Sequence, residues 1–143
     1  MSVTTGTFVT TNRSEYGVAN ADFDEDGDLD LFLPNARSEA ASTLYRNDLA
    51  GANHWLKVHC TGGASNRSGI GAKVRLVLPS GRTLHEHVTT ANGIYSASDR
   101  RVHFGLGTEK TITYIEIAWP SGIVQRVERP AVNQVLRVVE TAR

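Results

Sequence analysis

Five aspartates recur at every second position in the segment Asp22–Asp30, which reads D-F-D-E-D-G-D-L-D. On a flat strand their carboxylates would lie about 6.6 Å apart, too far for one ion bound at about 2.3–2.6 Å. The segment must therefore curl, and Gly27 is the residue that readily takes a positive φ. Neighbouring carboxylates repel by about 1 kcal/mol per close pair unless a cation neutralises them. Because oxygen ligands favour hard cations, the sequence predicts a Ca²⁺ site.

This loop differs from an EF-hand calcium loop in two respects. Its twelfth position is Leu33, where an EF-hand needs a bidentate glutamate. Its flanks, Gly17–Ala21 and Leu29–Leu33, have the composition of short strands and not of paired helices. We therefore expect a β-loop-β arrangement in which Asp30 closes the ligand shell. An acidic, solvated turn is the alternative.

Two histidines, His85 and His87, share one face of an expected strand, and this spacing can bind zinc or copper. No pattern in the sequence brings a third ligand, such as His54, His59 or His103, close to them. Two solvated histidines on an outer strand face are the favoured alternative.

Three carboxylates, Glu86, Glu116 and Asp99, are the candidates for a catalytic pair of the glycosidase type. Nothing in the sequence fixes the separation of about 5–9 Å that such a pair requires. A salt bridge from Glu116 to an arginine of a neighbouring strand explains that residue equally well. A small polysaccharide-active enzyme, glycoside hydrolase-like or metal-dependent, is therefore the second functional hypothesis.

Exposed aromatic rings beside polar groups are typical of carbohydrate sites. Trp119, at a strand end before Pro-Ser-Gly, is the main candidate for an exposed ring, with Tyr95 as a second candidate. Burial of both tryptophans in the core is the favoured alternative. Asn66 and Arg67 lie in a glycine-rich turn that can cradle an anion or a sugar, or can simply shape the chain.

Composition indicates a folded, strand-rich protein of one domain, or one domain with an appendage. The net charge of zero conceals an asymmetry: residues 1–50 carry nine acidic and three basic side chains, and residues 51–143 carry six and twelve. The basic residues are scattered singly along the expected strands without accompanying aromatics, which argues against nucleic-acid binding. Cys60 is the only cysteine, so no internal disulfide forms.

No apolar run reaches the roughly 20 residues of a membrane span. The first residues lack the apolar core of a signal peptide. We expect either a cytoplasmic protein or a piece excised from a longer exported one.

Apolar patterns of period two dominate after residue 53. The tripeptides Pro79–Gly81 and Pro120–Gly122 separate apolar runs and each predict a hairpin. No twelve residues have helical periodicity, and the run Ser38–Ser42 is too short for an independent helix. The sequence predicts an all-β fold, a β-sandwich of the jelly-roll kind. The expected strands are His54–Cys60, Ala72–Leu78, Arg82–Thr89, Ile94–Ala97, Arg101–Phe104, Ile112–Trp119, Ile123–Glu128 and Gln134–Glu140.

The first fifty residues have a different pattern, with a strand, the acidic loop, a strand over Leu31–Pro34 and another over Thr43–Asp48. Three short strands cannot bury a core of their own. We expect them to pack against the sandwich, or to have lost neighbours from a longer parent. The predicted domains are residues 1–50 and 53–140, with a boundary near Leu49–Asn53.

Several motifs, in order, carry a resemblance to known families. The loop Asp22–Asp30, with Gly17–Ala19 before it and Leu44–Asn47 after it, resembles one FG-GAP (VCBS-type) repeat, the blade unit of integrin-like β-propellers. Residues 53–140 resemble the ASPIC/UnbV domain that follows such repeats in bacterial exported proteins and in proteins of the cartilage acidic protein type. The matching pieces are Asn53–Leu56, Ser65–Ala72, Gly93–Ser96, His103–Gly107 and Trp119–Gly122.

The resemblance implies an extracellular or cell-surface module, and calcium-dependent binding or adhesion more readily than catalysis. It implies that the side chains of Asp22, Asp24, Asp26 and Asp30 bind Ca²⁺ and that Asp28 contributes its backbone carbonyl. A single repeat cannot close a propeller, so the ligand-binding face of a propeller is not carried over. We expect a non-catalytic module that binds Ca²⁺ and recognises a polysaccharide or an extracellular protein.

Overall fold

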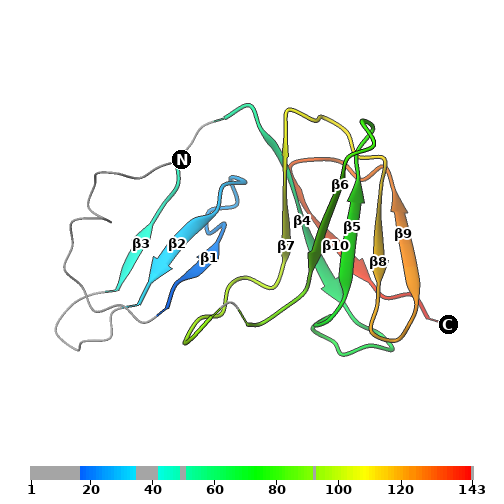
Figure 1. Ribbon diagram of the computed structural model, residues 1–143, viewed down its shortest axis with the longest axis horizontal. Coiled ribbons are helices and arrows are strands. Elements are labelled where there is room, and N and C mark those ends of the chain that lie inside the picture. The colour runs from blue at the N-terminus through cyan, green and yellow to red at the C-terminus, as the bar shows by residue number, and fades with distance from the viewer. Residues whose placement is uncertain (1–16, 35–41, 49–50, 92, 143) are drawn as a thin grey trace.

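The computed structural model describes residues 17–34, 42–48, 51–91 and 93–142. All regular structure in these residues is β-strand, arranged in three sheets (Figure 1), and they contain no helix long and apolar enough to cross a bilayer. The prediction of an all-β sandwich is confirmed. The strands are β1 (Ala19–Ala21), β2 (Asp30–Leu33), β3 (Thr43–Tyr45), β4 (His54–Thr61), β5 (Lys73–Val77), β6 (Thr83–His87), β7 (Val102–Gly107), β8 (Tyr114–Ala118), β9 (Val124–Glu128) and β10 (Gln134–Val139).

Two facing sheets make up the sandwich. One has the antiparallel order β6-β5-β8-β9, and the other has the order β10-β4-β7. The two predicted turn tripeptides connect β5 to β6 and β8 to β9, where Gly81 and Gly122 take φ values of 83° and 88°. The sequence patterns did not predict that β10 runs parallel to β4.

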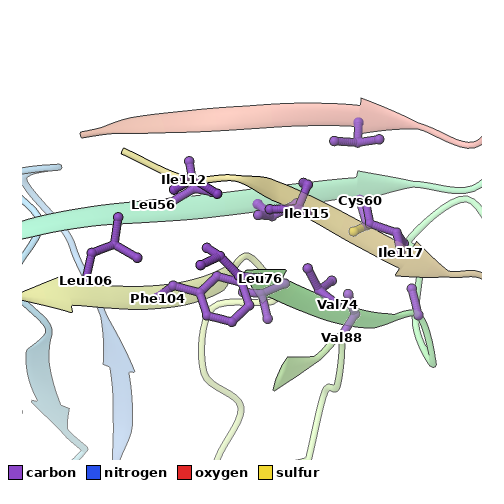
Figure 2. Packing of buried hydrophobic residues seen from close by; sticks show 14 of the residues in the cluster. Leu56, Cys60, Val74, Leu76, Val88, Phe104, Leu106, Ile112, Ile115 and Ile117 are labelled. Atoms are coloured by element: carbon purple, nitrogen blue, oxygen red, sulfur yellow. The ribbon is translucent and has the colours of Figure 1, made fainter. Parts of the chain in front are cut away.

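The hydrophobic core lies between these sheets. Alternate residues of β4, namely Leu56, Val58 and Cys60, are buried in it, and Ile115 and Ile117 of β8 reach it from the other sheet (Figure 2). Each fully buried aliphatic side chain contributes about 1.5–3 kcal/mol to folding. The other core residues are Ala72, Val74, Leu76, Leu78, Val88, Val102, Phe104, Leu106, Ile112, Trp119 and Val138.

One of the eight strands expected after residue 53, Ile94–Ala97, is not a strand. Tyr95 there takes a positive φ of 55°, which breaks the extended backbone, and Ile94 and Tyr95 are exposed. The sandwich therefore has seven strands among the described residues, one fewer than the eight of a jelly roll.

The third sheet, of order β1-β2-β3, is antiparallel and lies beside the sandwich, with β1 nearest to it (Figure 1). Leu33 is buried, but Leu31, Phe32 and Leu44 remain exposed. This agrees with the expectation that three short strands cannot bury a core of their own. Residues 38–41 of the Ser38–Ser42 run, and residues 49 and 50 of the expected domain boundary, lie outside the described residues.

Candidate metal centre

The acidic loop joins β1 to β2 and is curled, as its aspartate spacing required. Gly27 takes a φ of 102°, the positive value expected for it, and Glu25 also takes a positive φ, of 61°. Two left-handed residues within three positions turn the chain sharply, so alternate carboxylates no longer lie along a straight strand.

This curl brings the side chains of Asp22, Asp24 and Asp26 together. Each offers a carboxylate oxygen, and the three oxygens lie within 4.8 Å of one another. Two oxygens on one Ca²⁺ can be separated by up to about 5 Å, twice the Ca–O distance. The spacing therefore fits a single hard cation.

Asp22 is the most informative member of this group because only 1% of it is exposed. Its Oδ1 has no hydrogen-bond partner among the described residues. A buried acceptor left without a partner costs about 1–3 kcal/mol, and more when it is charged. A cation bound beside Asp24 and Asp26 would supply the missing partner.

The other oxygen of Asp22 is fully used by the protein. Its Oδ2 lies 2.6 Å from Nζ of Lys57 and accepts a hydrogen bond of 3.0 Å from the backbone N–H of Gly27. Lys57 also donates to the backbone oxygen of Asp22, at 3.2 Å, and its own side chain is buried. Oδ2 of this carboxylate therefore contacts both the loop, through Gly27, and a lysine of the sandwich.

Asp30 and Asp28 lie outside this group of three. Both oxygens of Asp30 accept backbone hydrogen bonds of 2.8 Å, from Phe23 at the start of the loop and from Asn47 after β3. The backbone N–H of Asp28 donates to Oδ1 of Asp26 at 2.9 Å. Asp30 thus braces the loop, and a ligand role for Asp28 and Asp30 stays a prediction.

The carboxyl of Asp28 reflects the crowding of negative charge in the loop. Its pKa is raised, first by desolvation and then by repulsion from Asp26, Asp22 and Asp30. Like charges that close disfavour ionisation unless a cation is present.

The loop rests on the outer face of β4, where Trp55 and Lys57 alternate with the core residues. A Cβ atom on Gly27 would lie 2.0 Å from Cδ1 of Trp55, so only glycine fits against the indole ring. Nζ of Lys57 lies 5.5 Å from the Trp55 ring centroid, and the ring of His103 stacks on it at 6.2 Å. The sequence patterns did not predict that Trp55 and Lys57 contact the acidic loop. The signal was present, because a lysine interrupts the apolar run of this strand.

A second set of contacts joins the small sheet to residues 96–101. Ser96 Oγ and Ser98 Oγ accept hydrogen bonds from the backbone N–H groups of Val18 and Asn20, at 3.0 and 3.1 Å. Arg101 forms a salt bridge of 2.8 Å with Glu25 of the loop. Ser96 of the segment predicted as a strand, and Ser98 just after it, therefore hold β1 and the residue before it through side-chain oxygens.

A cleft of about 240 Å³ lies between the loop and the sandwich, and Lys57, Glu86, Asp99 and His103 are among the residues that line it. Nδ1 of His103 is buried with no partner among the described residues. The pKa of His103 is lowered, first by desolvation and then by the charge of Lys57.

The three candidate catalytic carboxylates do not form one constellation. Glu116 forms a salt bridge of 3.1 Å with Arg75, and the strand register places it on the opposite sheet face from Glu86. Glu86 and Asp99 line the same cleft, but Asp99 accepts hydrogen bonds from both Nε and the backbone N–H of Arg101. The enzyme hypothesis stays a prediction.

His85 and His87 are exposed on β6, opposite Arg75 and Lys73 of β5. In the part of the chain that the structure describes, Asp22, Asp24 and Asp26 are the one group of three or more potential metal ligands brought together. The described residues thus supply no third ligand beside this histidine pair.

Trp119, the main candidate for an exposed ring, is buried, which is the alternative that the sequence analysis favoured for it. It is 3% exposed and its Nε1 donates to Gln125 at 3.1 Å, because alternation with Ile115 and Ile117 points it into the core. Tyr95 is 83% exposed.

Asn66 and Arg67 have different surroundings. The Asn66 side chain bonds both the N–H and the C=O of Ile70, which closes the glycine-rich turn. Arg67 is exposed and lines a separate groove.

The carboxylate of Glu140 accepts hydrogen bonds from two of the turns. It is buried and accepts hydrogen bonds from the backbone N–H groups of Gly63 and Ser65 and from the hydroxyls of Ser65 and Ser121. Burial alone raises the pKa of Glu140, but the hydrogen bonds, first that of Ser121, outweigh it and lower the pKa from 4.5 to about 2. One carboxylate therefore joins the turn after β4, the turn after β8 and the end of β10.

Comparison with known proteins finds a family and relatives to which this chain is similar. The model of the ASPIC and UnbV family matches residues 62–143. Cartilage acidic protein 1 of Mus musculus and of Homo sapiens is 31% identical over an alignment of 123 residues, which covers 82% of this chain and 18% of that protein. The Xenopus tropicalis protein is 31% identical over 127 residues. The chain therefore spans less than a fifth of the length of these relatives.

Proposed function

Because the chain belongs to the ASPIC and UnbV family, we propose that it is a non-catalytic extracellular module that binds a structural Ca²⁺ and recognises a glycan or a protein. The calcium loop and its flanking strands correspond in this proposal to one FG-GAP-like repeat. The observation that carries the calcium part is the buried Oδ1 of Asp22, which has no partner among the described residues.

Asp22, Asp24 and Asp26 would hold the ion, and its positive charge would offset the repulsion between the carboxylates of the loop. Asp30 keeps the loop closed through its backbone hydrogen bonds. Because Asp22 also contacts Lys57, binding of the ion stabilises the folded loop in the position where it docks on β4. Any ligand that binds only the folded state raises its stability in this way.

The extracellular and recognition parts rest on the family and on the named relatives. Of the three carboxylates considered for catalysis, Glu116 and Asp99 are engaged in salt bridges. Glu86 lies on the opposite sheet face from Glu116. A binding module therefore agrees better with the described side chains than a polysaccharide-active enzyme does.

Thermal unfolding in Ca²⁺ and in EDTA tests the calcium part. We expect a higher Tm in Ca²⁺ for the natural chain and no difference for Asp24→Asn, because Asp24 belongs to the group of three but is exposed. Asp48→Asn is the matched control: Asp48 is also exposed and, like Asp24, pairs with Arg46. Equal Tm values of the natural chain in the two buffers would end the calcium proposal.

A polysaccharide and protein pull-down with and without EDTA tests the recognition part. Captured ligand that is released unchanged in length supports a binding module. Shortened polysaccharide would instead support the enzyme, and Glu86→Gln would then be the variant that identifies the active carboxylate.

A further inference from the structure

We propose that the sandwich carries a binding groove for an acidic polysaccharide whose sulfate or carboxylate groups pair with arginines. The arginine groove has a volume of about 560 Å³ and is lined by Arg67, Arg100, Arg101, Arg137, His59 and Asp99, among others. The inference deepens the recognition part of the proposed function and does not depend on Ca²⁺. The arginine groove includes none of the three candidate metal ligands Asp22, Asp24 and Asp26.

Four parts of the chain supply this groove. His59 lies on the outer face of β4, and Arg137 of β10 is its registered neighbour. Arg67 comes from the turn after β4, and Arg100 and Arg101 precede β7. These residues are dispersed in the sequence, and the fold brings them together at one groove.

The charges in the groove are unbalanced. Within the described part of the chain, Asp99 is its one lining carboxylate, and it lies 2.6 Å from Arg101, which also pairs with Glu25. The described residues place no carboxylate within salt-bridge distance of Arg67, Arg100 or Arg137. Three cations that share one groove repel one another, and an anion bound among them removes that repulsion.

One of these arginines is held in place. Nη1 of Arg137 lies 3.2 Å from Nδ1 of His59. Because a guanidinium only donates, Nδ1 of His59 must be the acceptor in this contact. The pairing fixes Arg137 over β4 and leaves its remaining N–H groups available for a ligand.

The chemistry of the groove favours an acidic polysaccharide over other polyanions. The planar N–H fork of arginine matches the oxygens of sulfate and carboxylate groups. Single-stranded nucleic acid is usually held by aromatic platforms on which its bases stack. Among the described residues, the only ring that lines this groove is His59, and Arg137 contacts it.

The test uses the whole chain and a heparin decasaccharide as the probe, with titration calorimetry at about 0.15 M NaCl, where distant surface charges are screened. The groove variant is Arg67→Gln with Arg137→Gln. The control variant is Lys73→Gln with Lys110→Gln, which removes the same charge from exposed residues outside the groove. We expect the groove variant to bind at least about tenfold more weakly and the control to change by less than about twofold.

Several outcomes would overturn the proposal. These are absent heparin binding by the natural chain, equal losses in the two variants, and tighter binding of polyglutamate or of single-stranded DNA than of heparin. The calcium part is judged separately, because the groove variant should keep its Tm increase in Ca²⁺. A chain that binds heparin but has equal Tm values in Ca²⁺ and EDTA keeps this proposal and loses only the calcium part.

Discussion

Nζ of Lys57 lies 2.6 Å from Oδ2 of Asp22, and both side chains are almost completely removed from solvent. The lysine belongs to β4 of the sandwich and the aspartate to the acidic loop. An ion pair of this kind gains stability only when its remaining polar atoms have partners. Oδ1 of Asp22 has none among the described residues, so the pair connects the two parts of the chain and leaves one oxygen for a cation.

Replacing Lys57 with methionine tests this arrangement. In EDTA, the buried carboxylate of Asp22 loses its counter-ion, and breaking a buried pair costs about 3–5 kcal/mol. Bound Ca²⁺ would restore positive charge beside Asp22. We therefore expect the Tm increase on adding Ca²⁺ to be larger in Lys57→Met than in the natural chain.

Arg75→Met is the control for that experiment. Arg75 pairs with Glu116 on the outer face of the other sheet, where both side chains are partly exposed. Its loss should cost no more than about 1 kcal/mol and leave the calcium increment unchanged. A smaller increment in Lys57→Met than in the natural chain would contradict the prediction and would mean that Lys57 is needed to position Asp22 for the ion.

Gly27→Ala should weaken the docking of the loop on Trp55. The new Cβ would lie 2.0 Å from the indole, and the φ of 102° adds strain of about 1–2 kcal/mol. Gly81→Ala is the matched control, since Gly81 has a φ of 83° but open space around its Cβ. We expect red-shifted tryptophan fluorescence and weaker Ca²⁺ binding in the first variant alone. Equal effects of the two changes would show that backbone strain, and not the contact, is responsible.

Much of the sandwich was predictable because its strands alternate strictly. Leu56, Val58 and Cys60 face the core as their period-two pattern predicted, and the proline-glycine turns lie at the expected positions. The same alternation buries Trp119, as the favoured alternative had it, because this residue continues the inward-facing series of β8. Local pattern therefore determines which residues are buried in the core, including one first considered for a ligand site.

The features that sequence reasoning missed depend on pairing between distant segments. Arg137 meets His59 only because β10 runs parallel to β4, and no local pattern encodes that pairing. The positive φ of Tyr95 likewise interrupts an apolar run that otherwise has the composition of a strand. The acidic loop was predictable because its chemistry lies within nine consecutive residues. Its contact with Lys57 was not, because 35 positions separate Asp22 from that lysine.

The stability of the sandwich should depend on Glu140 in a defined pH range. Its folded-state pKa is lowered from 4.5 to about 2, so its ionised form stabilises the fold above about pH 4.5. This contribution is lost as the pH falls from about 4.5 towards 2. We expect the difference in Tm between the natural chain and Glu140→Gln to be largest above pH 5 and to shrink as the pH approaches 2.

Glu128→Gln is the control for Glu140. Glu128 is exposed and pairs with Arg126 at 2.6 Å on the surface. Surface pairs contribute about 0–1 kcal/mol, so this variant should have a nearly constant, small difference in Tm across the range. A Glu140→Gln difference that does not change between pH 6 and pH 2 would contradict the role assigned to the ionised carboxylate.

Cys60 should be unreactive in the native protein even though it lines the arginine groove. Its side chain is 3% exposed, and burial raises the pKa of its thiol to about 11. Because the thiolate is the reactive form, we expect negligible alkylation by iodoacetamide at about pH 8 in native buffer and complete alkylation in guanidinium chloride. Mass spectrometry of the intact chain measures both. Rapid modification under native conditions would mean that β4 opens to solvent beneath the arginine groove, and the arrangement of Arg137 over His59 would then not be a stable one.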